Sequence, residues 1–267
     1  MLFPFSFMQA QGPIYDVDAA AFFARVTAAG GSLTLTEKSA VNTLVIQMKA
    51  DGTWTPMKAI YPMVGASAAA CAQNLKSSSF TGTFSSGWTF ASTGVTPNGT
   101  SAYMDTAFTP SANQSVNNFS LSVYVRTSTM AVSRCDMGSG DGPSALPLCN
   151  IETNATTRFV YAWDYQTAFK TTITTDASGM WGSSRSGASS WQSFERNTAS
   201  AQTSTVTTSG VPNFSVYIGG MNFNNTLAAP SFRQVAFAHL GDSLSGTQFN
   251  NFYTAVQAFQ TTLSRNV

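Results

Sequence analysis

Charged side chains are scarce in this chain. Its 13 Lys and Arg and 12 Asp and Glu make up 9% of 267 residues, against about 25% in an average soluble domain. The formal net charge is +1, which gives no basic surface for nucleic acid and no polybasic segment for an acidic membrane. The polar surface must consist of Ser, Thr, Asn, Gln and Gly, and its weak charge repulsion favours a place in a packed assembly.

Catalytic groups are also few. The single histidine, His239, lies three residues before Asp242 and close to Ser243. No Gly-x-Ser-x-Gly motif accompanies it, and a lone histidine at a strand end is typical of a hydrogen-bonded structural residue. Glu195 and Asp164 would suit a glycosidase only if they faced each other, which nothing in the sequence indicates. We therefore expect no enzymatic activity and no cofactor.

Long apolar runs are absent, since a bilayer span needs ~20 apolar residues. Residues 1–8, MLFPFSFM, are apolar, but they lack a basic start and are too short for a secretion signal. Burying one such side chain is worth ~1.5–3 kcal/mol. We therefore expect an attachment arm that docks on another subunit through Leu2, Phe3, Phe5 and Phe7.

The three cysteines, Cys71, Cys135 and Cys149, cannot all pair with one another, and their spacing matches no zinc motif. Cys135 and Cys149 flank a Gly- and Pro-rich loop and could approach each other, but free thiols in a reducing cytoplasm are the favoured interpretation. In the same region Asp136 and Asp141 are candidate calcium ligands, because calcium binds carboxylates on flexible loops. The alternative is a solvated turn.

The first ~65 residues have the 3.6-residue period of helices. Asp16 or Asp18 can cap a first helix, and Thr34 with Glu37 forms a capping box before a second. A shorter helical piece is expected at residues 56–60. The apolar positions that predict the two helix faces are Ala19, Phe22, Phe23 and Val26, then Val41, Leu44, Val45 and Met48.

From about residue 80 the period changes to that of strands, with Gly, Ser and Asn turns between them. This pattern predicts a mainly β protein, an antiparallel β-sandwich with N-terminal helices. A capping box at Ser245 and Gln248 starts a C-terminal helix, and Ser-rich residues 183–203 are expected to form an ordered loop. The expected strands are residues 80–84, 88–90, 102–104, 119–125, 159–163, 169–174, 204–208, 214–218 and 234–239. The organisation is an arm at 1–15, a helical segment at 16–66 and the sandwich with its C-terminal helix at 67–267.

Four aromatic residues, Trp163, Tyr165, Trp181 and Trp191, lie among Asn and Asp side chains. Aromatic faces beside polar groups make sugar-binding platforms, because the ring stacks on C–H surfaces while the polar groups bind hydroxyls. The alternative is that these rings are core or subunit contacts.

Several stretches point to a known family. They are MKAIYPMV at 57–64, GVTPNGTSAYMDT at 94–106, FYTAVQAFQ at 252–260 and LSRNV at 263–267, with strand-like segments at 119–126 and 214–220. Together they resemble bacteriophage virion proteins that carry a concanavalin-A-like, laminin-G-like jelly-roll module. The resemblance implies a jelly-roll sandwich, and no catalytic residue of the family can be matched here.

The resemblance further implies a structural virion protein made in the host cytoplasm and displayed on the particle as a head-fibre, tail-fibre, decoration or adhesin subunit. Its expected partners are other virion proteins, reached through the arm, a host surface glycan and further copies of itself. Closed symmetry is the physical expectation for such copies, and a trimer suits a fibre. A secreted lectin or a glycan-active enzyme on the same fold is the alternative.

Overall fold

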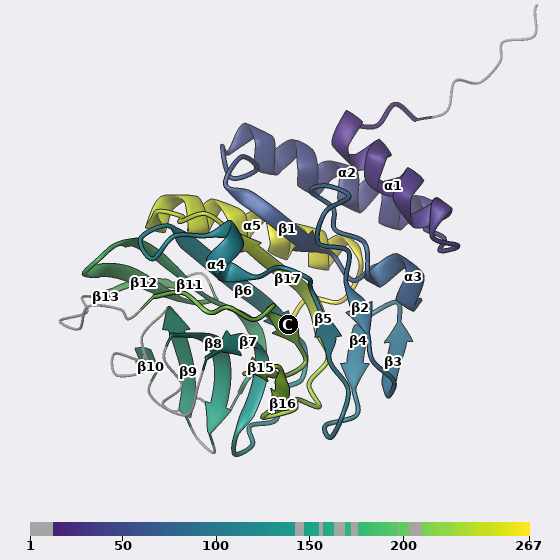
Figure 1. Cartoon of the computed structure of the whole chain (residues 1–267). Helices are drawn as coiled ribbons and strands as arrows, with labels where there is room; N and C mark the ends of the chain where they lie inside the picture. The colour runs from purple at the N-terminus through teal and green to yellow at the C-terminus, as the bar shows by residue number, and fades with distance from the viewer. Residues whose placement is uncertain are drawn as a thin grey trace, which may run out of the picture.

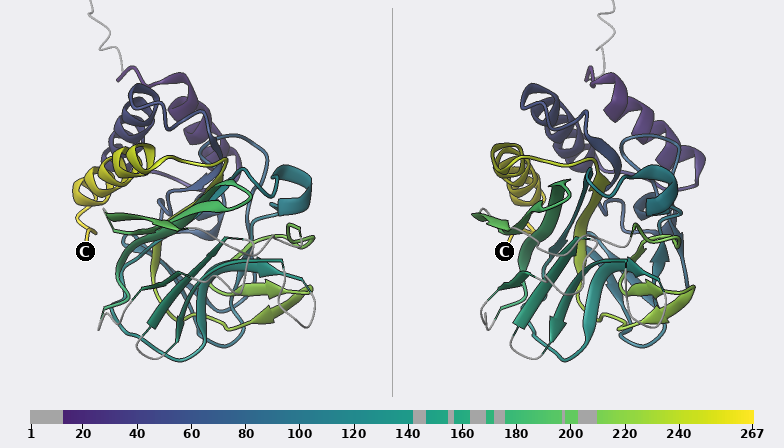
Figure 2. Two further views of the ribbon diagram at one scale, coloured as in Figure 1. Left: turned by 90° about the vertical axis from the view of Figure 1, so that its left-hand side faces the viewer. Right: turned by 60° about the vertical axis from the view of Figure 1, so that its left-hand side comes forward.

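Two β-sheets face each other as a sandwich, and helices gather on the outer side of one sheet (Figures 1 and 2). This arrangement confirms the predicted mainly β jelly-roll sandwich with N-terminal helices and a C-terminal helix. None of the helices in the described part of the chain combines the length and hydropathy needed to span a bilayer. The computed structural model describes residues 13–141, 147–154, 157–162, 169–171, 176–196, 198–202 and 210–267.

The three long helices are α1 (Val17–Ala28), α2 (Leu35–Ala50) and α5 (Gly246–Thr262). Asp16 caps α1 by accepting a hydrogen bond from the Asp18 backbone N–H, and the two predicted capping boxes start α2 and α5. Each cap satisfies backbone donors that a helix start leaves free. Short helices α3 (Ala68–Cys71) and α4 (Pro110–Asn113) lie in connecting segments.

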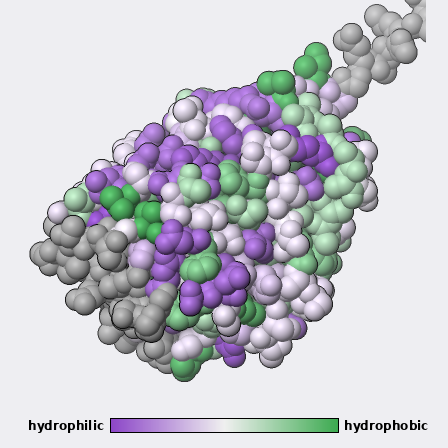
Figure 3. Space-filling view, viewed as in Figure 1, coloured by the Kyte–Doolittle hydropathy of each residue, from purple (hydrophilic) through white to green (hydrophobic). Residues whose placement is uncertain are grey.

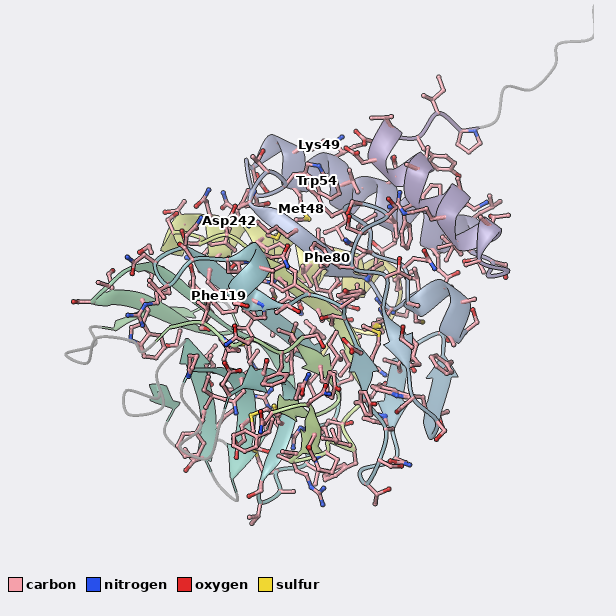
Figure 4. All side chains as sticks on the ribbon, in the orientation of Figure 1. Met48, Lys49, Trp54, Phe80, Phe119 and Asp242 are labelled. Carbon is pink, nitrogen blue, oxygen red and sulfur yellow. The ribbon has the colours of Figure 1, made fainter. Side chains whose placement is uncertain are left out.

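Lys49 ties the first two helices together. Its Nζ lies 2.7 Å from Asp16 Oδ1 and 2.6 Å from Asp18 Oδ2, and it lies over the ring of Trp54 at 5.7 Å from the centroid. Figure 4 shows Lys49 at the side of α2 that faces α1, with Trp54 just below it. The hydrogen bond that Lys49 Nζ donates to Asp16 Oδ1 holds the pKa of Lys49 above its ordinary value and the pKa of Asp16 below its own.

The first sheet has β17 near its middle. Along one edge β17 pairs with β6. Along its other edge, one end of β17 pairs with β1 and the other end pairs with β4. In order, its strands are β13 (Thr198–Gln202), β12 (Ser190–Glu195), β11 (Gly179–Gly187), β6 (Phe119–Val125), β17 (Val235–Gly241), β4 (Gly94–Pro97) and β3 (Trp88–Ala91), with β1 (Met57–Tyr61) added at β17.

The second sheet is antiparallel except where β15 runs parallel to β7. Its main path is β10 (Phe169–Thr171), β9 (Thr157–Ala162), β8 (Leu148–Asn154), β7 (Arg134–Gly140), β14 (Tyr217–Ile218), β5 (Met104–Asp105) and β2 (Thr83–Phe84), and the hairpin of β15 (Met221–Phe223) and β16 (Thr226–Ala228) joins at β7.

Three sequence-based expectations were wrong. Residues 57–61 form β1, a strand, because its backbone pairs with β17 instead of coiling. The region expected to be a calcium-type loop contains β7 and β8, and most of the expected loop at 183–203 is β11, β12 and β13. The expected strand at 204–208 lies outside the described residues.

The molecule has two apolar layers. Between the sheets, Leu121 and Val123 of β6 are fully buried, whereas Tyr124 of the same strand turns outward to the helices. In the outer layer Phe194 of β12 stacks on Phe249 of α5, with ring centroids 3.5 Å apart. Because each buried side chain of this size contributes ~1.5–3 kcal/mol, the helices are an integral layer of the fold.

Candidate functional site

Seven of the 25 charged side chains gather at one end of the sandwich, in a chain that has few charges to distribute. They are linked by ion pairs or by direct electrostatic coupling, and they come from β7, β8, β9, β12 and adjoining segments. We call this group the charge cluster. Its members are Asp136, Glu152, Arg158, Asp176, Glu195, Arg196 and Arg233.

Asp136 is the centre of the charge cluster. The register of β7 shifts between Cys135 and Met137, and Asp136 is the extra residue at this bulge. Its Oδ1 accepts from Arg233 Nε at 2.8 Å, and its Oδ2 accepts from Arg158 Nη2 at 2.8 Å. Burial by itself would raise the pKa of Asp136, but the two arginines outweigh it and hold that pKa below its usual value. The carboxylate is therefore ionised and fully engaged.

Arg158 has hydrogen-bonding capacity to spare. Its guanidinium is fully buried and lies over the ring of Trp181, 4.5 Å from the centroid. Nη2 is bonded to Asp136, but Nε and Nη1 have no hydrogen-bond partner. Burial lowers the pKa of Arg158 to about 10, against the opposing effect of Asp136. An unsatisfied buried donor costs ~1–3 kcal/mol, so Arg158 stands at this position at a cost to the stability of the fold.

Glu195 supplies the complementary acceptor. It is the cross-strand partner of Trp181 in the β11–β12 ladder, so its side chain shares the inward face with that ring. The Glu195 side chain is half-buried, and burial raises its pKa while Arg196 and Arg158 act in the opposite direction. A guanidinium with free donors and a carboxylate thus flank the same indole.

The rim of the charge cluster is an exposed ion pair. Arg196 Nη2 lies 2.9 Å from Asp176 Oδ2, with 40% and 42% of the two side chains accessible to solvent. Such an exposed pair contributes little stability, ~0–1 kcal/mol. Because Arg196 directly follows Glu195 in the chain, the half-buried Glu195 carboxylate lies where the interior meets solvent.

The predicted aromatic platform is not formed by the two tryptophans that the structure describes. Trp181 is fully buried, and its Nε1 donates to the carbonyl oxygens of Ala177 at 3.1 Å and Ser178 at 3.2 Å. Trp191 is 3% exposed and pairs across the ladder with Arg185. Both rings belong to the packed interior of the sandwich, because the second sheet covers the face of the first sheet that carries them. Trp163 and Tyr165 lie outside the described residues.

His239 is the structural residue that the sequence predicted. It is fully buried under α5, with Nε2 3.1 Å from Ser120 Oγ, Nδ1 hydrogen-bonded to Ser122 Oγ, and the Phe252 ring 4.8 Å away. Burial lowers the pKa of His239 to about 3, so the imidazole is neutral. Asp242 pairs with Lys58 at 3.0 Å, away from the imidazole.

The two calcium candidates do not converge on a cation. Asp136 is held by arginines, and Asp141 accepts from the backbone N–H and the Nδ2 of Asn213 at 2.9 Å each. Within the described ranges, no three His, Cys, Asp or Glu side chains are grouped to hold a metal ion. Asp136 and Asp141 therefore do not form the expected calcium site. Asp164 and the arm residues Leu2, Phe3, Phe5 and Phe7 lie outside the described residues.

The three cysteines are free and buried, and burial raises the pKa of each thiol. Cys135 stands opposite Glu152 in the β7–β8 ladder, and Cys149 stands opposite Ser139. Their thiols therefore belong to packed strands.

Two surface hollows lie away from the charge cluster. One of about 210 Å³ is lined by hydroxyl side chains such as Thr34, Ser92 and Ser264. Another of about 310 Å³ lies between α2 and α5, with Gln47, Asn251 and Thr254 in its wall. Neither offers the convergence of donors, acceptor and buried charge found around Arg158.

Sequence reasoning missed Arg158 and Arg233. The available signal was their position: Arg158 directly precedes the apolar residues at 159–160, and Arg233 lies two positions before those at 235–238. An arginine placed there is rarely buried without a partner. The sequence does not indicate which carboxylate each of these arginines pairs with.

The protein is a jelly-roll β-sandwich with a cluster of charged side chains at one end of the space between its sheets. Domain 4 of AbnA, a GH43 extracellular arabinanase from Geobacillus stearothermophilus solved with arabinotriose, has a TM-score of 0.51 and 11% identity, covering 74% of this chain and 98% of that domain. A mutant Trypanosoma rangeli sialidase has a TM-score of 0.55 and 11% identity, covering 82% of this chain and 39% of the sialidase. At this identity the similarity shows the fold alone. No family model matches the chain, and no curated protein matches its sequence.

Proposed function

We propose that this protein is a non-catalytic glycan-binding protein whose ligand binds at the charge cluster. The observation that carries the proposal is the group formed by Trp181, by Arg158, which lies over its ring with two unpartnered donors, and by half-buried Glu195, which stands opposite Trp181 in the β11–β12 ladder. Sugar hydroxyls both accept and donate hydrogen bonds, so neighbouring hydroxyls complement a group of this kind. The arabinotriose complex of the structurally similar arabinanase domain supports a sugar ligand for the fold.

The absence of catalysis is part of the same proposal. Glycoside hydrolysis uses two carboxyl groups that face the scissile bond. Both oxygens of Asp136 are engaged by buried arginines, and Asp176 is paired with Arg196. Glu195 and Glu152 are then the carboxylates of the charge cluster without an ion-pair partner among the described side chains, and Glu152 accepts a hydrogen bond from Asn150 Nδ2 at 3.0 Å within β8. We propose that these two do not act as a hydrolytic pair.

Glycan microarrays followed by calorimetric titration test the proposal. The wild-type protein should bind a defined oligosaccharide, and Glu195→Ala should lose at least tenfold in affinity while keeping the same melting temperature. Asp242→Asn, which changes a carboxylate paired with Lys58 far from the cluster, is the matched control. Wild-type protein that binds no glycan, or Glu195→Ala protein that binds normally, would contradict the proposal.

We further propose that the protein is displayed on a bacteriophage particle, where it would present the same site to host glycans. Its support is the sequence resemblance and the low charge, and the face shown in Figure 3 mixes polar and apolar residues finely. Mass spectrometry of purified particles tests this location, and its absence from particles would overturn it.

A further inference from the structure

We propose that the groove between α2 and α5 receives residues 1–8 of the arm from a second copy of this chain. The proposal concerns self-assembly and is independent of the glycan ligand. It follows from the shape of the groove, from the state of the charges in its walls, and from exposed apolar side chains at the base of the arm.

A continuous groove follows the seam between α2 and α5, which lie next to each other on the outer side of the first sheet (Figure 2). Three hollows, of about 210, 80 and 310 Å³, succeed one another along this seam. Thr262 lines the first and the second, and Gln47 and Ala258 line the second and the third. The hollows therefore join into one groove along α2, whose 16 residues span about 24 Å.

The groove has an apolar floor and a small, neutral rim. Leu44 and Phe259 are buried at its floor, and exposed Thr43, Thr254 and Ala258 stand along its edges. Small rim side chains leave the floor accessible to a bulky apolar group from outside. Burying apolar surface there is favourable.

The carboxylates in the walls of the groove are already engaged. Glu37 accepts from two backbone N–H groups, each at 2.8 Å, and Asp51 accepts from Gln47 Nε2 at 3.0 Å. Residues 1–12 carry no charged side chain. This segment can therefore enter the groove without leaving a charged side chain buried and unpaired.

The length and the pattern of the arm suit the groove. Eight extended residues span about 26 Å, which matches the length of the groove. Pro4 disfavours a helical conformation for the residue before it. In an extended segment Phe3, Phe5 and Phe7 share one face, because alternate side chains point the same way. That face supplies three rings for the apolar floor.

Exposed apolar side chains favour a second copy over the arm's own groove. At the base of the arm, Ile14 and Val17 are 90% and 74% accessible to solvent. An arm that turns back over its own α2 leaves both side chains on the outer surface, whereas an arm that enters a neighbouring molecule brings its base against that molecule. Leu35 and Ile46, exposed on α2, offer apolar contacts there. In a closed ring of copies every arm finds a groove.

Disulfide trapping between two different variants tests the contact directly. One chain carries Phe5→Cys and the other carries Ala258→Cys, while the chain's own three cysteines are buried. On oxidation the mixture should give a linked pair whose disulfide joins positions 5 and 258, identified by mass spectrometry. The control mixture uses Ala28→Cys, at an exposed alanine that ends α1, in place of Ala258→Cys. It should give at least tenfold less of the linked pair.

Ala258→Arg places a long charged side chain in the groove from an exposed helix position, so the melting temperature of the domain should not change. Self-association measured by sedimentation should weaken at least tenfold, whereas Ala28→Arg protein should associate as the wild type does. A mixture that forms no disulfide between positions 5 and 258 overturns the proposal. If a chain carrying both new cysteines then forms that disulfide internally, the arm lies in its own groove. A monomeric wild type, or normal association of Ala258→Arg protein, also overturns the proposal.

Discussion

The guanidinium of Arg265 donates to the carbonyl oxygen of Met63, Nη1 to O 2.8 Å, across 202 positions of sequence. Nη2 of the same side chain donates to the carbonyls of Pro62 at 2.6 Å and Ala236 at 2.9 Å, and Nε to Gln260. The arginine is fully buried, and burial lowers its pKa to about 10. Its contacts hold the segment after α5 against the segment after β1 and against β17.

Replacing Arg265 by Ala should destabilise the protein by about 3 kcal/mol or more, because several buried carbonyl oxygens lose their donor at once. Urea unfolding followed by fluorescence measures the change. Asn266→Ala, at an exposed neighbouring position, serves as control and should change the unfolding free energy by less than about 0.5 kcal/mol. A loss below 1 kcal/mol for Arg265→Ala would mean that water replaces the guanidinium.

Asp136→Asn should cost roughly 3–5 kcal/mol, because it leaves the buried cations of Arg158 and Arg233 without their counter-charge. Calorimetric melting of the variant beside Asp141→Asn tests this. Asp141 is a partly exposed carboxylate that bonds Asn213, and its replacement should have a small effect. Equal melting temperatures for the two variants would show that Asp136 does not stabilise the sandwich end.

His239 makes the protein less stable in acid. Its pKa is about 3 in the folded state and about 6.5 in an unfolded chain. Between these values the unfolded state binds the extra proton, so the free energy of unfolding falls as pH falls, by up to about 1.4 kcal/mol per pH unit from this group. His239→Gln removes that contribution and should flatten the decline between pH 6 and pH 4. Parallel slopes for variant and wild type would contradict this assignment.

Deleting residues 2–8 should leave the melting temperature unchanged. Helix α1 is anchored without the arm, since Tyr15 packs edge-on against Phe23 at 5.0 Å and the Asp16 backbone N–H donates to Asn42 at 2.7 Å. We expect the truncated protein to lose its oligomeric mass in light scattering and its incorporation into particles. Normal incorporation would refute the attachment arm, and a collapsed domain would show that the arm belongs to the core.

The helices were predictable because their information is local. Thr34 and Glu37, or Ser245 and Gln248, lie three positions apart and cap the helix start by themselves. The apolar faces of α1 and α2 likewise follow from spacing alone.

Strands β6 and β17 were predicted at 119–125 and 234–239, but β11 was not predictable in the same way. In β11 both faces are covered, so no alternation of polar and apolar residues marks it. Gly182 is required there because a Cβ would lie 2.6 Å from the carbonyl oxygen of Leu121, yet glycine in the sequence suggests a loop. The charge cluster could not be predicted for a different reason: Arg233 pairs with Asp136 across 97 positions of sequence, and no local pattern indicates such a contact.

The pairing of β1 with β17 has a consequence for synthesis on the ribosome. Met57–Tyr61 is made well before its hydrogen-bonding partner at Val235–Gly241, which emerges only after residues 62–234 have been added. Contacts of such long sequence separation form slowly. Until then Ala59 and Ile60, buried in the finished protein, have no strand beside them, and a nascent chain in this condition is prone to pair with a neighbour. Slow translation of the codons between β1 and β17 should therefore lower the yield of native protein more than slow translation of the codons before β1.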